Sequence, residues 1–451
     1  MKKLVILSVI ASLALADNSV TTLTIDQTNE IYNNTDISNG ATVSQGQTDI
    51  KNGSNVENVT ITQTDNTIDN SQISGTDSEI YQGLTSVDSS RLENATLDST
   101  NSIKDITVTG GKSTITQGNL IIGGNSNVTG TASSGSNHGG SGENIKITET
   151  NTLEDTDIQN STIDQGLTKV NNGAVVSSTF NLQQTNNINR VTTFGDNDGK
   201  TNDINGTITQ GLTTISGGST SNIDQNIQNN ISYMQIDGTT VNQSSINLIN
   251  STVENINNTN SSSTIDEINR IEHVTGNGET SSIIQSNITA ENSTIDNLQR
   301  SGTVSAYGKD TTNWIDKLTL TDSNIKQSTF VANGTMGSTV QNITYGIVNT
   351  DNREAINDIY SVTALTNSNL QQDVTEIENS TFKDSQVNRV NLMANLTASN
   401  SDIAQSKLSI TNSTANQLQL SNDNTIGDWE SSNSVSTTNA VLEQGSTIIT
   451  D

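Results

Sequence analysis

A three-residue phrase, an aliphatic residue, any residue and then glutamine, returns along the chain at a nearly fixed interval. The third positions of six successive phrases are separated by 18, 18, 19, 17 and 18 residues. Self-similarity at a short fixed period is the signature of stacked repeat proteins, in which each repeat contacts only its neighbours. The six phrases are Ile25-Asp26-Gln27, Val43-Ser44-Gln45, Ile61-Thr62-Gln63, Ile80-Tyr81-Gln82, Leu97-Asp98-Ser99 and Ile115-Thr116-Gln117.

The local pattern of each phrase indicates a strand. A period near 18 is too short for helical repeats but suits one coil of a β-solenoid. Leu23, Ile25 and Gln27 alternate with polar residues, so that they fall on one side of a strand. The sequence therefore predicts an all-β protein, an elongated β-solenoid (β-helix) with coils of roughly 18 residues, rich in Asn, Gln, Ser and Thr.

Composition alone would indicate disorder, and the repeat overrides it. Only 29% of the residues are apolar and the net charge is −29, a combination that usually buries too little apolar surface to offset the ordering entropy. However, the 451 residues include no proline, where average usage would give about 22. A β-ladder that uses every backbone N–H excludes proline, so its absence favours strands.

The repeated glutamines are the candidate structural site. Stacked coils lie about 4.8 Å apart, which lets amide side chains at equivalent positions form hydrogen-bonded columns. We expect the glutamine of each phrase to lie over that of the next; the alternative is that these side chains are solvated strand ends. The predicted ladder comprises Gln27, Gln45, Gln63, Gln82, Gln117, Gln165, Gln184, Gln210, Gln225 and Gln243.

The first 16 residues have the pattern of a secretory signal peptide. Lys2 and Lys3 precede an apolar run, and Ala14-Leu15-Ala16 supplies the small residues of a cleavage site. No later apolar run reaches the roughly 18 residues of a membrane span, and the chain contains no cysteine for disulfides. We therefore expect a bacterial protein that is secreted or held at the cell surface, with no membrane span.

The remaining residues, 17–451, predict a single solenoid domain. Coils are regular over residues 17–245, with insertions near 123–142 and 194–205, and less regular over residues 246–451. The phrase persists in this last part at wider intervals, and no linker separates the two parts.

A search for catalytic or metal-binding residues predicts that the chain is not an enzyme. The two histidines, His138 and His273, are far apart in sequence and are interpreted as incidental. The strong negative charge disfavours nucleic acid, because it repels phosphate. One acidic turn is a weak candidate for calcium, the only cofactor considered, but its spacing departs from the EF-hand pattern and a solvated turn is favoured. Its carboxylates are Asp196, Asp198 and Asp203.

Some phrases resemble the strand-plus-glutamine repeats of curlin, a secreted bacterial amyloid subunit. The resemblance covers five-residue stretches such as Leu23-Thr24-Ile25-Asp26-Gln27 and Val59-Thr60-Ile61-Thr62-Gln63. The Gly-x-x-Asn-x-Ala turn of that family is missing, and the spacing here is shorter. The resemblance implies a β-solenoid that stacks end to end into matrix fibres.

Three functions are consistent with the sequence. The first is a structural subunit, its partner a second copy of itself, that forms an extracellular fibre or biofilm matrix with the help of a secretion pore or nucleator. The second is a secreted or surface-bound β-helical adhesin, which would need a distinct tip or anchoring segment. The third is a β-helix carbohydrate-active enzyme, which would need an aromatic and basic cleft. The repeat and the lack of a recognisable catalytic motif favour the first.

Overall fold

Every element of the described structure is a β-strand, which confirms the predicted all-β class. No helix occurs in the parts of the chain that are described. The computed structural model describes residues 11–13, 19–20, 23–31, 36–38, 42–50, 55–74, 79–88, 91–109, 113–123, 127–129, 145–159, 161–171, 174–194, 207–236, 239–259, 267–276, 281–301, 311–335, 337–345, 357–393, 396–426 and 436–450.

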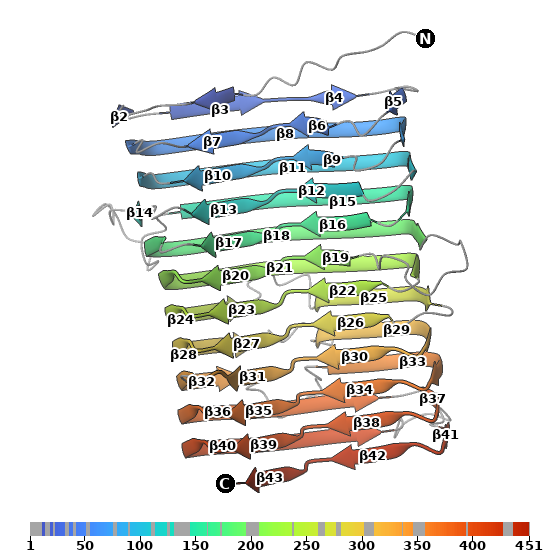
Figure 1. Ribbon diagram of the computed structural model, residues 1–451. Coiled ribbons are helices and arrows are strands. Elements are labelled where there is room, and N and C mark those ends of the chain that lie inside the picture. Colours follow the sequence, from blue (N-terminus) through green and yellow to red (C-terminus); the bar gives the residue numbers. More distant parts are fainter. Residues whose placement is uncertain are drawn as a thin grey trace, which may run out of the picture. The chain divides into compact units, whose positions relative to one another are not determined.

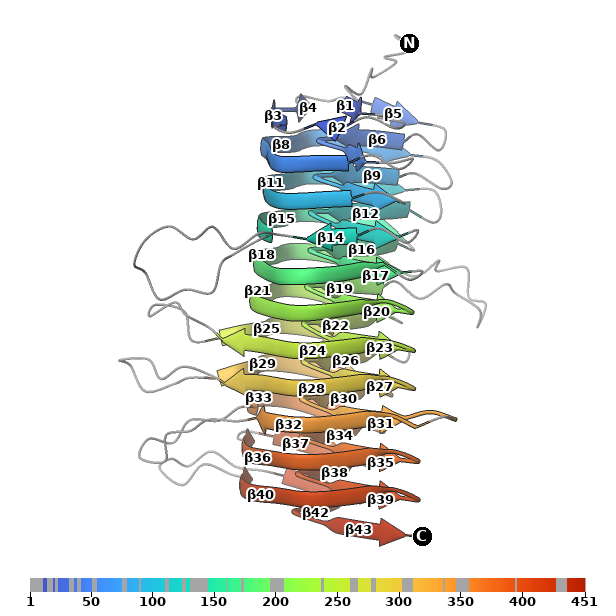
Figure 2. The same ribbon diagram turned by 90° about the vertical axis from the view of Figure 1, so that its left-hand side faces the viewer.

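The chain divides into two compact units. The first contains Met1–Gly211 and Ile215–Ile223, and the second contains Leu212–Thr214 and Asp224–Asp451. Two strands, β20 (Thr213–Ser216) and β21 (Ser219–Ile236), contain residues of both units. Each unit consists of stacked parallel strands in three sheets, named sheet 1, sheet 2 and sheet 3 in the order in which the chain visits them (Figures 1 and 2).

In the first unit all pairings between strands are parallel and in regular register. Sheet 1 contains β6 (Thr42–Gln45), β9 (Glu79–Gln82), β12 (Ser113–Gln117), β16 (Ser161–Gln165) and β19 (Thr207–Gln210). Sheet 2 contains β1 (Ala11–Leu13), β7 (Thr48–Ile50), β10 (Thr85–Asp88), β13 (Leu120–Gly123) and β17 (Thr168–Asn171). Sheet 3 contains β2 (Ser19–Val20), β3 (Leu23–Gln27), β4 (Glu30–Ile31), β5 (Asp36–Ser38), β8 (Asn55–Ser74), β11 (Arg91–Thr109), β14 (Asn127–Thr129), β15 (Ile145–Gln159) and β18 (Val175–Phe194).

The second unit repeats the same order of sheets with shorter strands in sheet 3. Sheet 1 contains β22 (Thr240–Gln243), β26 (Ser282–Gln285), β30 (Asn324–Gln327), β34 (Asn369–Gln372), β38 (Asp402–Gln405) and β42 (Val441–Gln444). Sheet 2 contains β23 (Ile246–Ile249), β27 (Ile288–Glu291), β31 (Phe330–Asn333), β35 (Thr375–Glu378), β39 (Leu408–Thr411) and β43 (Thr447–Thr450). Sheet 3 contains β24 (Thr252–Thr259), β25 (Glu267–Gly276), β28 (Thr294–Ser301), β29 (Thr311–Thr321), β32 (Thr339–Tyr345), β33 (Asn357–Thr366), β36 (Thr381–Met393), β37 (Leu396–Ser399), β40 (Thr414–Ile426) and β41 (Ser436–Thr438).

The β-solenoid is confirmed, but the predicted coil length of roughly 18 residues is wrong. The strands β6, β7 and β8 belong to one coil, and the next strand, β9, pairs with β6. Stacked residues of sheet 1 are separated by 37, 35, 48 and 45 residues in the first unit. The phrase occurs twice per coil, once in sheet 1 and once in sheet 3, because each of these sheets directs a glutamine into the core. The sequence period therefore reports half a coil.

The core combines aliphatic side chains with amides. In β6 the side chains of Val43 and Gln45 are buried, and in β7 those of Thr48 and Ile50 are buried. Isoleucine is the most frequent large residue in this core, with Ile61, Ile80 and Ile115 among its fully buried side chains. β-Branched side chains suit the pleated surface of a sheet, which explains why so few apolar residues pack an ordered core.

Each coil turns from sheet 1 to sheet 2 through a residue with positive φ. In the first unit this residue is a glycine directly after the inward glutamine, as at Gly83, with φ +66°. A Cβ atom on Gly83 would lie 2.8 Å from Asn101 Nδ2. The turn therefore needs glycine both for its backbone conformation and for the space that the Asn101 amide fills.

We expect Gly83→Ala to destabilise the first unit more than Gly217→Ala does. Gly217 has nearly the same φ, +65°, but a Cβ there meets no atom within 4 Å. Both substitutions carry the backbone strain, and only Gly83→Ala adds steric overlap, which should cost about 1–3 kcal/mol more. Urea unfolding of the two variants measures the difference. Equal losses of stability would show that Asn101 does not fill the corner.

Candidate functional site

The most regular arrangement of polar groups in the first unit is a buried column of glutamines in sheet 1, here called the glutamine column. The side-chain Nε2 of each glutamine donates to Oε1 of the glutamine one coil earlier, at 2.8 Å in all four steps. Each of these four donors also approaches a backbone carbonyl oxygen of sheet 3, as Gln82 Nε2 does at 3.0 Å from Asn66 O. The column contains Gln45, Gln82, Gln117, Gln165 and Gln210.

The second unit contains a glutamine column of its own. Its steps are 2.7 to 2.9 Å long, and every Nε2 again donates to the preceding coil. All but the last of these glutamines are fully buried. Because a buried amide without partners costs about 1–3 kcal/mol, continuous pairing along the column is what makes a polar core tolerable. The column contains Gln243, Gln285, Gln327, Gln372, Gln405 and Gln444.

Sheet 3 carries a second set of columns, made of asparagine. Here the donor direction is reversed, because Nδ2 of each asparagine donates to Oδ1 of the asparagine one coil later, at 2.7 to 2.9 Å. In the first unit the members are Asn29, Asn66, Asn101, Asn151 and Asn186, and in the second they are Asn229, Asn269, Asn313, Asn357, Asn391 and Asn424.

The predicted ladder is correct in kind but wrong in its order. Gln45 stacks on Gln82, and the intervening Gln63 belongs to sheet 3, where its Nε2 donates across the core to Thr48 Oγ1 at 3.1 Å. Consecutive phrases therefore lie in different sheets of the same coil. The alternative of solvated strand ends is also wrong for Gln63, which is 1% exposed.

Residues of the other phrases form a further column in sheet 3 of the first unit. The backbone register places Gln27 beside Gln63, then Ser99, Glu149 and Gln184. Gln184 Nε2 donates to Glu149 Oε2 at 2.8 Å. The side chains of Gln27 and Gln225 lie outside the described residues, and the remaining members of the predicted ladder are in the columns given above.

Glu149 is a carboxyl group in a column of amides. Burial raises the pKa of Glu149 well above its ordinary value of 4.5, and the hydrogen bond from Gln184 opposes this shift. Its neighbours are neutral: Ser99 and Gln184 above and below it, and Asn151 and Gly118 beside it. Burial without a cationic partner favours the protonated acid, which is isosteric with the glutamine found at this place in other coils.

In the second unit the corner after the glutamine is occupied mainly by serine, and its hydroxyl joins the asparagine column. Asn269 Nδ2 donates to Ser286 Oγ at 2.8 Å, and Ser286 Oγ donates to Asn313 Oδ1 at 2.8 Å. Ser286 has a φ of +57°, a strained value for a residue with a side chain. The two hydrogen bonds offset that strain, so serine replaces the glycine of the first unit.

Serine also forms columns at two other corners of the second unit. The backbone N–H of Ser293 donates to Ser338 Oγ at 3.0 Å, and Ser338 N–H donates to Ser380 Oγ at the same distance. The second corner has the same arrangement, with Ser323 N–H donating to Ser368 Oγ. These bonds satisfy turn amides that the sheets leave unpaired.

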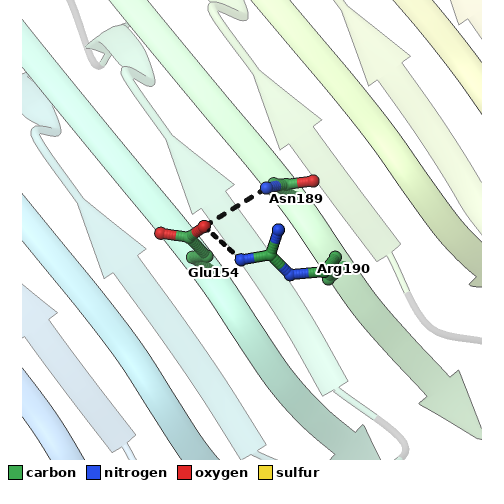
Figure 3. Close-up of polar contacts among 3 residues, drawn as sticks. All are labelled: Glu154, Asn189 and Arg190. Carbon is green, nitrogen blue, oxygen red and sulfur yellow. Dashed lines mark hydrogen bonds and ion pairs between the residues drawn. The ribbon is translucent and has the colours of Figure 1, made fainter.

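Charged and aromatic residues make isolated contacts on the surface rather than a cleft. Figure 3 shows Glu154 of β15 accepting from Arg190 Nη2 at 2.5 Å and from Asn189 Nδ2 at 3.3 Å, both from β18. In the second unit Tyr233 stacks on His273 with ring centroids 4.4 Å apart. Exposed pairs of this kind contribute about 0–1 kcal/mol and define no catalytic geometry.

The calcium candidates and one histidine fall outside the described structure. Asp196, Asp198, Asp203 and His138 all lie outside the described residues. Within the described ranges, no group of three or more His, Cys, Asp or Glu side chains is placed to hold a metal ion. A membrane-spanning helix is likewise not found among the residues that the structure describes.

Sequence reasoning missed the asparagine columns, although the sequence contains their signal. An asparagine follows the third position of the sheet 3 phrases by two or three residues, as in Gln63-Thr64-Asp65-Asn66, Ser99-Thr100-Asn101 and Gln184-Thr185-Asn186. Asparagine is so frequent in this chain that this spacing does not stand out until the coil length is known.

Comparison with known proteins adds no family. No protein-family model matches the chain, and no curated protein sequence matches it. Function is therefore inferred from the geometry of the columns alone.

The columns can recognise only another strand of the same kind. Amide groups are neutral at ordinary pH and provide neither a nucleophile nor a proton donor for catalysis. Their arrangement repeats at each coil and extends to the last coil of the second unit, at Gln444 and Asn424. This is the chemistry of register and stacking rather than of a reaction.

We expect Glu149→Gln to stabilise the first unit at pH 7 but not at pH 4. Folding raises the pKa of Glu149, so the unfolded chain loses this proton first as pH rises. Wild-type stability therefore falls above about pH 4.5 until the folded pKa is reached, by about 1.4 kcal/mol per pKa unit of difference. Denaturant unfolding between pH 4 and 8 measures it, with exposed Glu30→Gln as the control. A gap between variant and wild type that does not change with pH would contradict the buried acid.

We expect two glutamates in adjacent positions of the glutamine column to interact unfavourably. In the double variant Gln82→Glu with Gln117→Glu, the two carboxylates replace amides that are 2.8 Å apart. The destabilisation at pH 7 should exceed the sum of the single variants by about 1 kcal/mol or more. The matched control pairs Gln82→Glu with Gln165→Glu, which lie two coils apart and should be additive. Equal coupling in both pairs would contradict the stacking order.

Proposed function

We propose that this protein is a structural subunit, secreted by a bacterium, that assembles end to end into an extracellular fibre or biofilm matrix. The observation that carries the proposal is the uncovered end of the inward columns in the second unit. Leu442 is 45% exposed and Ile449 is 69% exposed, whereas Ile403 and Ile410, one coil earlier in the same columns, are 2% and 5% exposed. Covering such side chains with another coil contributes about 1.5–3 kcal/mol each.

The backbone of the same coil supports the proposal. The strands β42 and β43 pair with β38 and β39 on one edge, and their other edges have no partner strand among the described residues. Unpaired edges of parallel strands are templates for the addition of another strand. A second solenoid of the same coil would supply both the backbone pairing and the apolar cover, which makes a second copy the partner with the best match.

Charge sets the conditions under which this assembly is expected. The net charge of −29 makes two copies repel each other. Screening shortens the reach of this repulsion to about 8 Å at physiological ionic strength, so short-range pairing at the ends can then proceed. The predicted leader at residues 1–16 and the resemblance to curlin agree with a fibre outside the cell, and the proposed localisation rests on these two features.

We expect the secreted chain, residues 17–451, to form long fibres with a spacing of about 4.8 Å along the axis, and to form them faster as salt increases. Electron microscopy, fibre diffraction and light scattering over a salt series measure this. A chain that stays monomeric at every salt concentration while it binds a glycan or a host surface would replace the fibre with an adhesin.

We expect Ile449→Asp to slow fibre formation strongly, because a carboxylate would have to be buried in the joint between copies. Ile448→Asp is the matched control, since Ile448 adds the same charge one residue away on the outward face of β43. Both variants should keep the unfolding midpoint of the wild type, because both positions are exposed. The same loss of assembly in both variants would mean that charge alone, and not the uncovered column, controls joining.

A further inference from the structure

The hydrogen-bonding direction of the columns defines which end of one copy fits which end of another. In the glutamine columns the later coil donates to the earlier one, so Gln444 Nε2 is used on Gln405 and Gln444 Oε1 is the acceptor that a following coil needs. At the other end, Gln45 Nε2 contacts only the carbonyl of Thr67, at 3.3 Å, whereas Gln82, Gln117, Gln165 and Gln210 each bond to a preceding glutamine as well. Gln45 thus retains the donor that Gln444 requires.

The asparagine columns give the same orientation independently, although their direction is reversed. Asn424 accepts from Asn391, so that Nδ2 of Asn424 is the donor for a following coil. Asn29 donates to Asn66, so that Oδ1 of Asn29 is the matching acceptor. Head-to-tail contact therefore pairs donors with acceptors in both columns. Contact between two like ends would bring oxygen against oxygen or N–H against N–H.

The strands next to these residues have compatible side chains in the same register. Extending the pairings of β6 with β9 and of β38 with β42 places Leu442 on Val43 and Gln444 on Gln45. Extending sheet 2 in the same way places Ile449 on Ile50. The acidic residues nearest the joint, Glu443 and Asp49, fall opposite Ser44 and Ile448, so no two carboxylates face each other despite the high net charge.

One half of this surface is already occupied in the chain that retains its first residues. The strand β1 (Ala11–Leu13) pairs with β7, with Leu13 in register with Ile50. This is the edge of β7 to which β43 of another copy would add. Because β1 lies within the predicted leader, its removal would expose the edge.

We propose that β42 and β43 of one copy bind β6 and β7 of the next, head to tail and in this single register, and that β1 blocks half of the joint until residues 1–16 are removed. The inference rests on the proposed function, since it specifies the contact through which the fibre forms. It commits to a second copy of this chain as the partner and to one orientation of that copy.

Engineered disulfides test the orientation and the register directly, because the chain contains no cysteine. Ser44→Cys and Glu443→Cys are introduced into separate copies of the chain of residues 17–451. Their Cα atoms would be neighbours across the joint, within the 4.4–6.8 Å that a disulfide spans. Mixing the two copies under assembly conditions and oxidising them should give cross-linked pairs. Glu443→Cys mixed with Asp49→Cys is the control, and it should give none because Asp49 lies in sheet 2.

The outcomes separate the inference from the proposed function. Fibres that form without the Ser44→Cys to Glu443→Cys cross-link, or that cross-link Glu443→Cys to itself, would overturn the head-to-tail joint and leave the fibre intact. A preparation that forms no fibres at all would overturn the proposed function itself. Cross-linking in the first mixture and not in the control supports the joint.

The blocking role of β1 is tested in one preparation. A protease site replacing residues 14–18 lets the 1–451 chain, carrying the same cysteines, be cross-linked before and after cleavage. We expect at least about tenfold more cross-linked product after cleavage. The uncleaved variant Ser12→Pro with Leu13→Pro should also cross-link, because proline removes the N–H groups that β1 needs for pairing. Equal cross-linking before and after cleavage would overturn the block.

Discussion

The side-chain amide hydrogen bond between equivalent positions of successive coils is the interaction on which the rest of this structure depends. Only 29% of the residues are apolar, so an aliphatic core alone would not fill the coils. Glutamine and asparagine columns allow much of the core to be polar, because each buried amide finds its partner one coil away. The columns also fix the register, since a shift of one residue would turn every inward amide to solvent.

The corners and the columns constrain each other. A left-handed residue must follow each inward glutamine, and the amide that faces the corner decides which residue fits. Glycine is needed at Gly118, where a Cβ would approach Asn151 to 2.7 Å, whereas Ser286 tolerates the same backbone by bonding to two asparagines. The two units thus solve one geometric problem with different side chains. Glu149 shows the tolerance of this design, because an acid occupies an amide position once burial keeps its proton.

Strand content and the inward glutamines were predictable from the sequence, because alternation and periodicity act locally. Gln45, Gln82 and Gln117 are buried and stacked as expected. The coil length was not predictable from the 18-residue period, because Gln45 and Gln63 have the same local pattern although they lie in different sheets. Only long-range pairing distinguishes half a coil from a whole one. The partner of Gln45 is 37 residues away, and no local propensity records that distance.

The stacking order of the glutamines is the central claim, and solid-state NMR on the assembled or precipitated chain tests it most directly. Magnetisation transfer between the side-chain amide of Gln82 and other labelled side chains reports which residues lie within hydrogen-bonding distance. The structure requires contacts from Gln82 to Gln45 and Gln117, at 2.8 Å between donor and acceptor. Contacts from Gln82 to Gln63 and Ser99, its neighbours in the 18-residue period, would contradict the account.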